Sequence, residues 1–181
     1  MIIAELKQAT KGILLENESM SKHTSYGIGG KVRAYIIPYD VKDLIKIIKI
    51  MNEHNSKFYF VGSGSNLLVN DRKINAIIIT PAKALKSLTI NKNTIYAESG
   101  VMLGRLVKEA IKHNLTGLES LVGVPGTLGG ALMMNAGAWG SEISNYLISV
   151  DVINTEGKIK RLYPKDIEFK YRYSSLKSNE F

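Results

Sequence analysis

The sequence of 181 residues contains no cysteine. This absence excludes a disulfide framework, a Cys-ligated zinc site, an iron–sulfur cluster and a cysteine nucleophile. Long apolar runs are missing too, because uninterrupted stretches such as residues 76–79 have strand length, far below the ~18 apolar residues of a membrane span. The first 20 residues carry acids and form an amphipathic helical pattern, unlike a signal peptide. We therefore expect a cytoplasmic protein without membrane insertion.

Arginine is scarce among the basic residues. Of 24 Lys and Arg only 5 are Arg, against 16 acidic residues, which gives a net charge of +8. Nucleic-acid readers favour Arg for bidentate contacts, and no Lys or Arg occurs between His113 and Gly157. Abundant Lys, Ile and Asn together are also what AT-rich codons produce. We therefore expect no nucleic-acid partner, and we favour an anionic small molecule.

The remaining composition is that of a globular protein, with 45% hydrophobic and 22% charged residues in a length suited to one domain or two small ones. Apolar residues recur with helical spacing over residues 41–51, after a plausible N-cap at Asp40. Residues 57–61 and 74–80 have the character of buried strands. This order predicts a small βαβ-like unit with parallel pairing.

The second half predicts different elements. Residues 85–90 and 94–98 read as strands, 101–113 as an amphipathic helix, and 146–154 with 158–163 as a hairpin. The likeliest boundary between subdomains lies within residues 81–86. The predicted fold class is α+β.

A glycine-rich centre carries the most information about function. Between positions 117 and 140 there are seven glycines, namely Gly117, Gly123, Gly126, Gly129, Gly130, Gly137 and Gly140. Each costs about 0.5–1 kcal/mol relative to alanine inside regular structure, so the density suggests close approach of the backbone to a large flat ligand. Small and apolar residues between the glycines suit a pocket for an aromatic ring system. The alternative is a series of tight turns between short strands.

An earlier glycine cluster, GSGSNLL, begins at Gly62 directly after a predicted strand. It lacks the third glycine of the dinucleotide fingerprint, since position 67 is Leu67, and it lacks the Gly-Lys-Ser/Thr end of a P-loop. Its small polar residues, Ser63, Ser65 and Asn66, could still face an anion together with backbone amides. An ordinary turn at the end of a strand is equally compatible.

Four ordered motifs resemble one family. These are HTSYGIGG (23–30), VGSGSNLLV (61–69), GVPGTLGGALMMNAGAWG (123–140) and YRYS (171–174). Together they closely resemble the UDP-N-acetylenolpyruvoylglucosamine reductase family of bacterial cell-wall synthesis, from about residue 20 to the last residue. The resemblance implies a two-lobed FAD-binding domain of the vanillyl-alcohol-oxidase type. It also implies that NADPH reduces FAD and that the enolpyruvyl group of a UDP-sugar is then reduced to UDP-N-acetylmuramate for peptidoglycan, hence for cell shape and division.

The resemblance also assigns roles to residues. Arg172 would stabilise the developing oxyanion of the substrate, for which a permanently charged guanidinium is suited, and Tyr171 would bind the substrate beside it. The loop at 62–67 would hold the FAD diphosphate, and a second segment would line the flavin. The implied cofactor-binding residues are Gly62, Ser63, Gly64, Ser65, Asn66, Leu67, Pro125, Gly126, Thr127, Gly129, Gly130, Asn135 and Gly137. No metal ligand is expected.

The resemblance divides the chain into an N-terminal helical segment (1–23), a first FAD-binding lobe (24–82) and a second lobe with the flavin segment (83–181). The family's proton-donating Ser and late Glu follow the YR motif at a distance, whereas this chain ends nine residues after Arg172. Ser174 and Ser175 do not stand at the acid's place. We therefore expect a fragment without the substrate domain, inactive in isolation.

Two alternatives remain open. One is a FAD-binding module without catalytic activity. The other is a related oxidase with covalently attached FAD, for which only His23, His54 and His113 could serve because cysteine is absent. His54 and His113 fall at predicted helix ends, and His23 in a predicted loop. Non-covalent FAD is the expected cofactor.

Overall fold

The structure is a computed structural model that describes residues 2–177. The chain divides into two compact units. Unit 1 contains Met1–Leu85 and Thr155–Gly157, and unit 2 contains Lys86–Asn154 and Lys158–Phe181. Residues 1–23 are thus part of unit 1.

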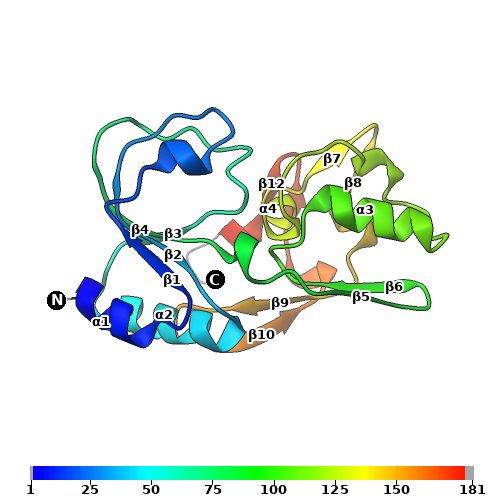
Figure 1. The fold of residues 1–181 in the computed structure, drawn as a ribbon. Helices are drawn as coiled ribbons and strands as arrows, with labels where there is room; N and C mark the ends of the chain where they lie inside the picture. Colours follow the sequence, from blue (N-terminus) through cyan, green and yellow to red (C-terminus); the bar gives the residue numbers. More distant parts are fainter. Residues whose placement is uncertain (1, 178–181) are drawn as a thin grey trace. The chain divides into compact units, whose positions relative to one another are not determined.

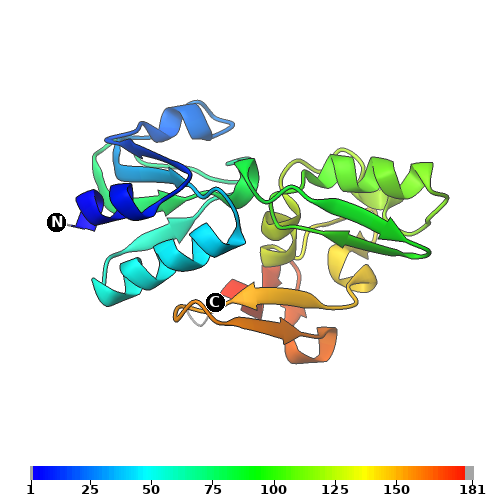
Figure 2. The ribbon, with the colours of Figure 1, turned by 60° about the horizontal axis from the view of Figure 1, so that its bottom comes forward.

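Unit 1 is built on a four-stranded mixed sheet with the strand order β1-β2-β4-β3. The strands are β1 (Ile13–Glu16), β2 (Val32–Ile37), β3 (Phe58–Phe60) and β4 (Ile74–Ile79). β4 pairs in parallel with both β2 and β3, and β1 pairs antiparallel with β2. The helices α1 (Ile2–Ala9) and α2 (Val41–Glu53) lie side by side below this sheet in Figure 1, and Figure 2 shows the same pair from another side. The predicted helix, the two predicted strands and the parallel pairing are confirmed.

The predicted helix over the first 20 residues is wrong beyond Ala9. The helix ends at Ala9, and at Gly12 the chain passes so close to the carbonyl oxygen of Ile37 that a side chain would overlap it. Residues 13–16 then join the sheet as β1, and residues 20–23 form the short 3-10 segment η1 (Met20–His23). Helical periodicity and an amphipathic edge strand are hard to separate over so few residues.

The start of α2 is fixed by two aspartates. The side chain of Asp40 accepts a hydrogen bond from the backbone N–H of Asp43 (2.8 Å), which confirms the predicted N-cap. Asp43 itself is only 4% exposed. Its carboxylate accepts backbone hydrogen bonds from Lys11 (3.0 Å), Gly12 (3.1 Å) and Tyr39 (2.8 Å). A single buried carboxylate therefore joins the end of α1 to the turn that enters α2.

Within the described residues, unit 2 contains two α-helices and four two-stranded hairpins. The helices are α3 (Leu103–Lys112) and α4 (Leu128–Met133), and the hairpins are β5 (Leu88–Asn91) with β6 (Thr94–Ala97), β7 (Gly137–Ala138) with β8 (Ser141–Glu142), β9 (Val150–Ile153) with β10 (Ile159–Leu162), and β11 (Phe169–Lys170) with β12 (Tyr173–Ser174). The predicted α+β fold class, the central helix and two of these hairpins are confirmed. The predicted strand beginning at Tyr146 is wrong in its first part, because residues 143–146 form the 3-10 segment η4 (Ile143–Tyr146) and the strand begins at Val150.

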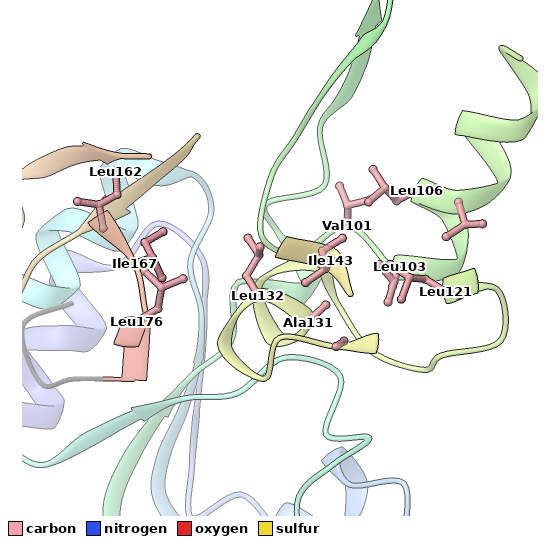
Figure 3. Close-up of a cluster of buried hydrophobic side chains, with 12 residues drawn as sticks. Val101, Leu103, Leu106, Leu121, Ala131, Leu132, Ile143, Leu162, Ile167 and Leu176 are labelled. Carbon is pink, nitrogen blue, oxygen red and sulfur yellow. The ribbon is translucent and has the colours of Figure 1, made fainter. Parts of the chain in front are cut away.

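The core of unit 2 gathers side chains from every part of that unit. Figure 3 shows ten of them labelled. The fully buried members include Leu103 and Val107 of α3 and Leu121 of the 3-10 segment η3 (Glu119–Leu121). Leu162, Ile167 and Leu176 belong to the same cluster and point toward one another in Figure 3. The glycine-rich centre thus folds around an ordinary apolar core.

Among residues 2–177, no helix has both the length and the apolar character needed to cross a membrane.

Candidate functional site

The first candidate segment is the loop that follows β3 in unit 1. Val61 donates the last sheet hydrogen bond, to the carbonyl of Ile79 (3.0 Å), and the glycine cluster then leaves the sheet. Gly64 has a φ of 71°, and its carbonyl accepts the N–H of Ser25 (3.1 Å). Within the described residues, no backbone N–H from position 62 to position 66 has a hydrogen-bond partner. A short run of unpaired N–H groups is what an anion requires.

The side chains of this loop divide into two groups. Ser63 and Ser65 are half-buried, and their hydroxyl oxygens lie 3.3 Å apart, while Asn66 is exposed. Leu67 instead packs against the buried cluster of unit 1 that includes Val32 and Tyr35. Leu67 can therefore serve a ligand only through its backbone. The Ser63 hydroxyl donates to the Ser65 hydroxyl, which can still donate in turn, and the Asn66 side chain is exposed.

The segment beneath the loop holds it in place. A side chain at Gly64 would overlap the carbonyl oxygen of His23, so the two backbones touch here. The His23 ring stacks on Tyr35, with centroids 3.8 Å apart and planes 13° apart, and its Nε2 lies 3.1 Å from Oε1 of Glu18. Burial acts to raise the pKa of the Glu18 carboxyl, but its hydrogen bonds with His23 and Lys22 outweigh burial and lower that pKa. Burial raises the pKa of the Tyr35 phenol.

The histidines have structural partners. His23 is in η1 and not in the predicted loop, and its ring is stacked as described above. His54 and His113 are the C-cap residues of α2 and α3, as expected for helix ends. His54 Nε2 lies 2.7 Å from a carboxylate oxygen of Glu5, and His113 Nδ1 lies 2.8 Å from the carbonyl of Glu109.

The second candidate segment, in unit 2, leads into α4. Thr127 is the N-cap, and its hydroxyl accepts the N–H of Gly130 (3.3 Å). Gly129 packs against Ser99, whose carbonyl accepts the N–H of Gly129 (2.9 Å). Pro125 is exposed, and within residues 2–177 the backbone N–H groups of Gly126 and Thr127 have no hydrogen-bond partner. This segment also offers unpaired donors beside small residues.

The residues after α4 form a hairpin that glycine makes possible. A side chain at Gly137 would lie 2.6 Å from the carbonyl oxygen of Ser141 and 2.9 Å from Cγ of Glu142. The turn is formed by Trp139 and Gly140, both with left-handed φ values (54° and 79°). Trp139 is 92% exposed. Part of the glycine density is therefore explained by tight packing within unit 2.

Asn135 stands at the end of α4 and is fully buried. Its side-chain nitrogen donates to Oε2 of Glu142 (2.6 Å) and to the carbonyl oxygen of Lys170 (3.2 Å). The resemblance assigns Asn135 to the flavin, but its side chain is engaged inside unit 2. Burial of this kind could not be read from the sequence.

Tyr171 and Arg172 form the turn of the β11–β12 hairpin. Arg172 has a φ of 56°, and its guanidinium carbon lies 4.8 Å from the centre of the Tyr171 ring. Tyr171 is 80% exposed, and Arg172 is exposed as well. No carboxylate among residues 2–177 pairs with Arg172. The turn thus presents a cation supported on an aromatic face, both open to a ligand.

Comparison with protein families gives a match to the model described as the FAD binding domain, over residues 32–163. Among curated proteins, the UDP-N-acetylenolpyruvoylglucosamine reductase of Caldanaerobacter subterraneus subsp. tengcongensis is 36% identical over 182 residues, which covers 100% of this chain and 60% of that protein. The corresponding protein of Carboxydothermus hydrogenoformans is 38% identical, with 97% of this chain and 58% of that protein covered. This chain therefore spans about 60% of the length of these curated relatives.

Among solved structures, UDP-N-acetylenolpyruvylglucosamine reductase from Thermus caldophilus has a TM-score of 0.74 and 27% identity, over 91% of this chain and 56% of that one. The 6-hydroxy-D-nicotine oxidase of Arthrobacter nicotinovorans has a TM-score of 0.67 at 16% identity, over 87% of this chain and 37% of that one. The latter likeness concerns the fold alone. The predicted FAD-binding fold and the predicted resemblance are confirmed by these matches.

Proposed function

The chain belongs to the FAD binding domain family, and from this premise we propose that it serves the NADPH-dependent reduction of UDP-N-acetylglucosamine enolpyruvate to UDP-N-acetylmuramate, with FAD as its cofactor. The first part of the proposal concerns where FAD is held. In unit 1, the residues present suit the diphosphate, because the N–H groups at 62–66 are unpaired and the hydroxyls of Ser63 and Ser65 lie in the same loop. This run of unpaired N–H groups is the observation on which the proposal mainly rests. We take units 1 and 2 to correspond to the two FAD-binding lobes.

In unit 2, we propose that the segment from Pro125 to Gly130 lines the flavin. The unpaired N–H groups of Gly126 and Thr127 can donate to the polar edge of an isoalloxazine ring. Gly129 and Gly130 keep the chain free of side chains that would hold a ring away. Each of the three histidines contacts another group of the protein, and we propose that FAD binds non-covalently. Bound FAD supplies hydride transfer between NADPH and the enolpyruvyl double bond.

Arg172 is the proposed catalytic residue. Addition of a hydride to the double bond leaves negative charge next to the substrate carboxylate, and a guanidinium keeps its positive charge at every working pH. The exposed Arg172 lies over the Tyr171 ring, which limits its freedom and leaves Tyr171 beside the same substrate group. We propose that this product enters peptidoglycan synthesis in the cytoplasm, and thereby cell shape and division.

The proposal is tested by separating cofactor binding from reaction. Purified protein freed of flavin is titrated with FAD, and flavin fluorescence gives the dissociation constant. Acid precipitation of the loaded protein should release free FAD into the supernatant. Anaerobic NADPH should then bleach the bound flavin. If the chain acts as the reductase, UDP-N-acetylglucosamine enolpyruvate should restore its absorbance, a result that would overturn the expectation that residues 1–181 are inactive in isolation.

Each step has a result that contradicts the proposal. Protein that binds no FAD excludes both the reductase and a cofactor-binding module. Protein that binds FAD but never recovers its absorbance with substrate is the FAD-binding module, the second candidate. Flavin that stays with the precipitate indicates a covalent link.

A further inference from the structure

Three helices of this protein end in the same way. The residue after the C-cap is an asparagine with left-handed φ in each case, and the next residue donates its N–H to the carbonyl five positions earlier. The asparagines are Asn55 (φ 46°), Asn114 (φ 56°) and Asn135 (φ 42°), and the hydrogen bonds are Ser56 to Met51 (3.0 Å), Leu115 to Ala110 (2.9 Å) and Ala136 to Ala131 (2.8 Å). Backbone geometry alone therefore does not distinguish these positions.

The side chains do distinguish them. Asn55 and Asn114 are exposed, whereas Asn135 is 0% exposed. Glycine suits the left-handed position at least as well, so a buried amide at Asn135 needs a reason of its own. That reason is the pair of hydrogen bonds from Nδ2 to Oε2 of Glu142 and to the carbonyl of Lys170.

The orientation of this amide is determined by its partners. Both Glu142 Oε2 and the Lys170 carbonyl are acceptors, so only the NH₂ group can face them. The other amide atom, Oδ1, is buried and has no hydrogen-bond partner in the part of the chain that the structure describes. Burying this oxygen without a hydrogen bond lowers the free energy of unfolding, and the two hydrogen bonds from the NH₂ group offset that cost.

These bonds act on the hairpin that carries Arg172. Lys170 is the last residue of β11 and directly precedes the Tyr171–Arg172 turn. From β12, the buried Ser174 hydroxyl donates to the carbonyl of Met133 (3.1 Å) at the end of α4. Both strands are therefore hydrogen-bonded to the same helix end, one on each side of the turn.

We propose that Asn135 is a positioning residue for Arg172. The buried amide fixes the carbonyl of Lys170, and through it the entry of the chain into the turn whose guanidinium meets the substrate. The catalytic meaning of this role rests on the proposed function, but the mechanical coupling to the hairpin does not.

The test compares two matched variants, Asn135→Gly and Asn114→Gly. Both put glycine at a left-handed helix end that accepts it, so the backbone cost is equal and neither should prevent folding. Amide hydrogen exchange then reports on residues 169–174. In Asn135→Gly these amides should exchange about tenfold faster, because one hydrogen bond to the hairpin is lost. Trypsin cleavage after Arg172 in the native protein should accelerate by a similar factor.

Local and general effects are separable in the same data. In Asn114→Gly the hairpin should keep its wild-type exchange and cleavage rates. Equal acceleration at all slow amides of unit 2 in Asn135→Gly would mean that Asn135 only stabilises the unit, and it would overturn the proposal. Unchanged exchange at 169–174 would overturn it as well.

A double-mutant cycle gives the readout that a purely structural role would not move. The rate at which substrate restores the absorbance of reduced flavin is measured for Asn135→Gly, Arg172→Ala and the double variant. Asn135→Gly should slow this step about tenfold with little change in substrate affinity, and it should add nothing once Arg172 is removed. Additive effects would overturn the positioning role. If wild-type protein shows no substrate-dependent step, the proposed function fails, while the exchange data still decide whether Asn135 holds the hairpin.

Discussion

Replacing Gly64 by alanine separates the shape of the loop at 62–66 from its chemistry. Gly64 has a φ of 71°, where an alanine costs about 1–2 kcal/mol. In addition, the new methyl group would overlap the carbonyl oxygen of His23. The backbone of His23 cannot move aside as a flexible side chain can, so the loop must move by about 1 Å. In active sites, a displacement of this size can lower the reaction rate about 100-fold.

The loss of affinity for FAD can be worked from this displacement. A hydrogen bond from a backbone N–H to a charged phosphate contributes about 1.5–3 kcal/mol. If the shift removes two of the unpaired N–H groups from the diphosphate, about 3–6 kcal/mol is lost. Gly64→Ala should therefore raise the dissociation constant for FAD by at least about 100-fold. It should also break the hydrogen bond from Ser25 to the Gly64 carbonyl.

Gly27→Ala is the matched control. Gly27 has a similar φ of 68°, but nothing lies within 4 Å of a methyl group built on it. This variant has the same left-handed cost without the overlap, so thermal unfolding should show a loss of about 1 kcal/mol while the affinity for FAD changes less than about threefold. Titration of flavin fluorescence measures both constants. Wild-type affinity in Gly64→Ala, or equal losses in the two variants, would refute the assignment of the diphosphate to this loop.

Three further predictions concern stability. Asp43→Asn should lower the free energy of unfolding by about 2 kcal/mol in urea, because the single amide oxygen that replaces two carboxylate oxygens cannot accept all three N–H groups. Asp40→Asn should cost less than about 0.5 kcal/mol, since asparagine is an equal N-cap, and equal losses in the two variants would contradict the role of Asp43. The lowered pKa of Glu18 stabilises the folded state above the ordinary value of 4.5, and this stabilisation disappears as pH falls through the lowered pKa. The difference in urea midpoint between wild type and Glu18→Gln should therefore be larger at neutral pH than below pH ~3, and a gap independent of pH would contradict it. Trp139→Asn should stabilise unit 2 by about 0.5–1 kcal/mol, because asparagine tolerates the left-handed backbone conformation better than tryptophan. Unfolding followed by circular dichroism measures this gain. An unchanged stability would mean that contacts of the exposed Trp139 ring already offset the backbone strain.

Much of the fold follows from local patterns in the sequence. The spacing of apolar residues locates α2 and α3. An aromatic run that ends before glycine locates β3, and an isoleucine-rich run that ends before proline locates β4. The N-terminal segment departs from its pattern for a tertiary reason. Residues 13–16 become strand because β2 offers them a partner and Asp43 binds the N–H groups of the preceding turn. No window of the sequence contains that information.

The candidate site shows a similar division. Motifs in the sequence bring attention to the loop at 62–66 and to Arg172, and the structure adds unpaired N–H groups and an aromatic support. The sequence does not reveal that Leu67 packs into the core or that Asn135 is buried, because both depend on neighbours distant along the chain. One signal for Asn135 is its place directly after the C-cap of α4. An asparagine at such a place is there either because its backbone adopts the left-handed conformation or because its side chain forms hydrogen bonds.

The glycine-rich centre can be sorted by asking what occupies the space of each missing side chain. At Gly117 the ring of Tyr146 fills it, and at Gly137 the backbone of Ser141 fills it, so these glycines serve packing within unit 2. At Gly123 nothing lies within 4 Å, and at Gly130 only the Thr127 hydroxyl lies at 3.5 Å. Gly140 is open as well, and the left-handed φ values of Gly123 (83°) and Gly140 (79°) favour glycine by themselves. Gly130 is then the open position whose glycine the backbone conformation does not explain, and it lies close in sequence to Gly126 and Thr127, whose N–H groups are unpaired in residues 2–177. This agrees with the proposal that the segment from Pro125 to Gly130 lines the flavin.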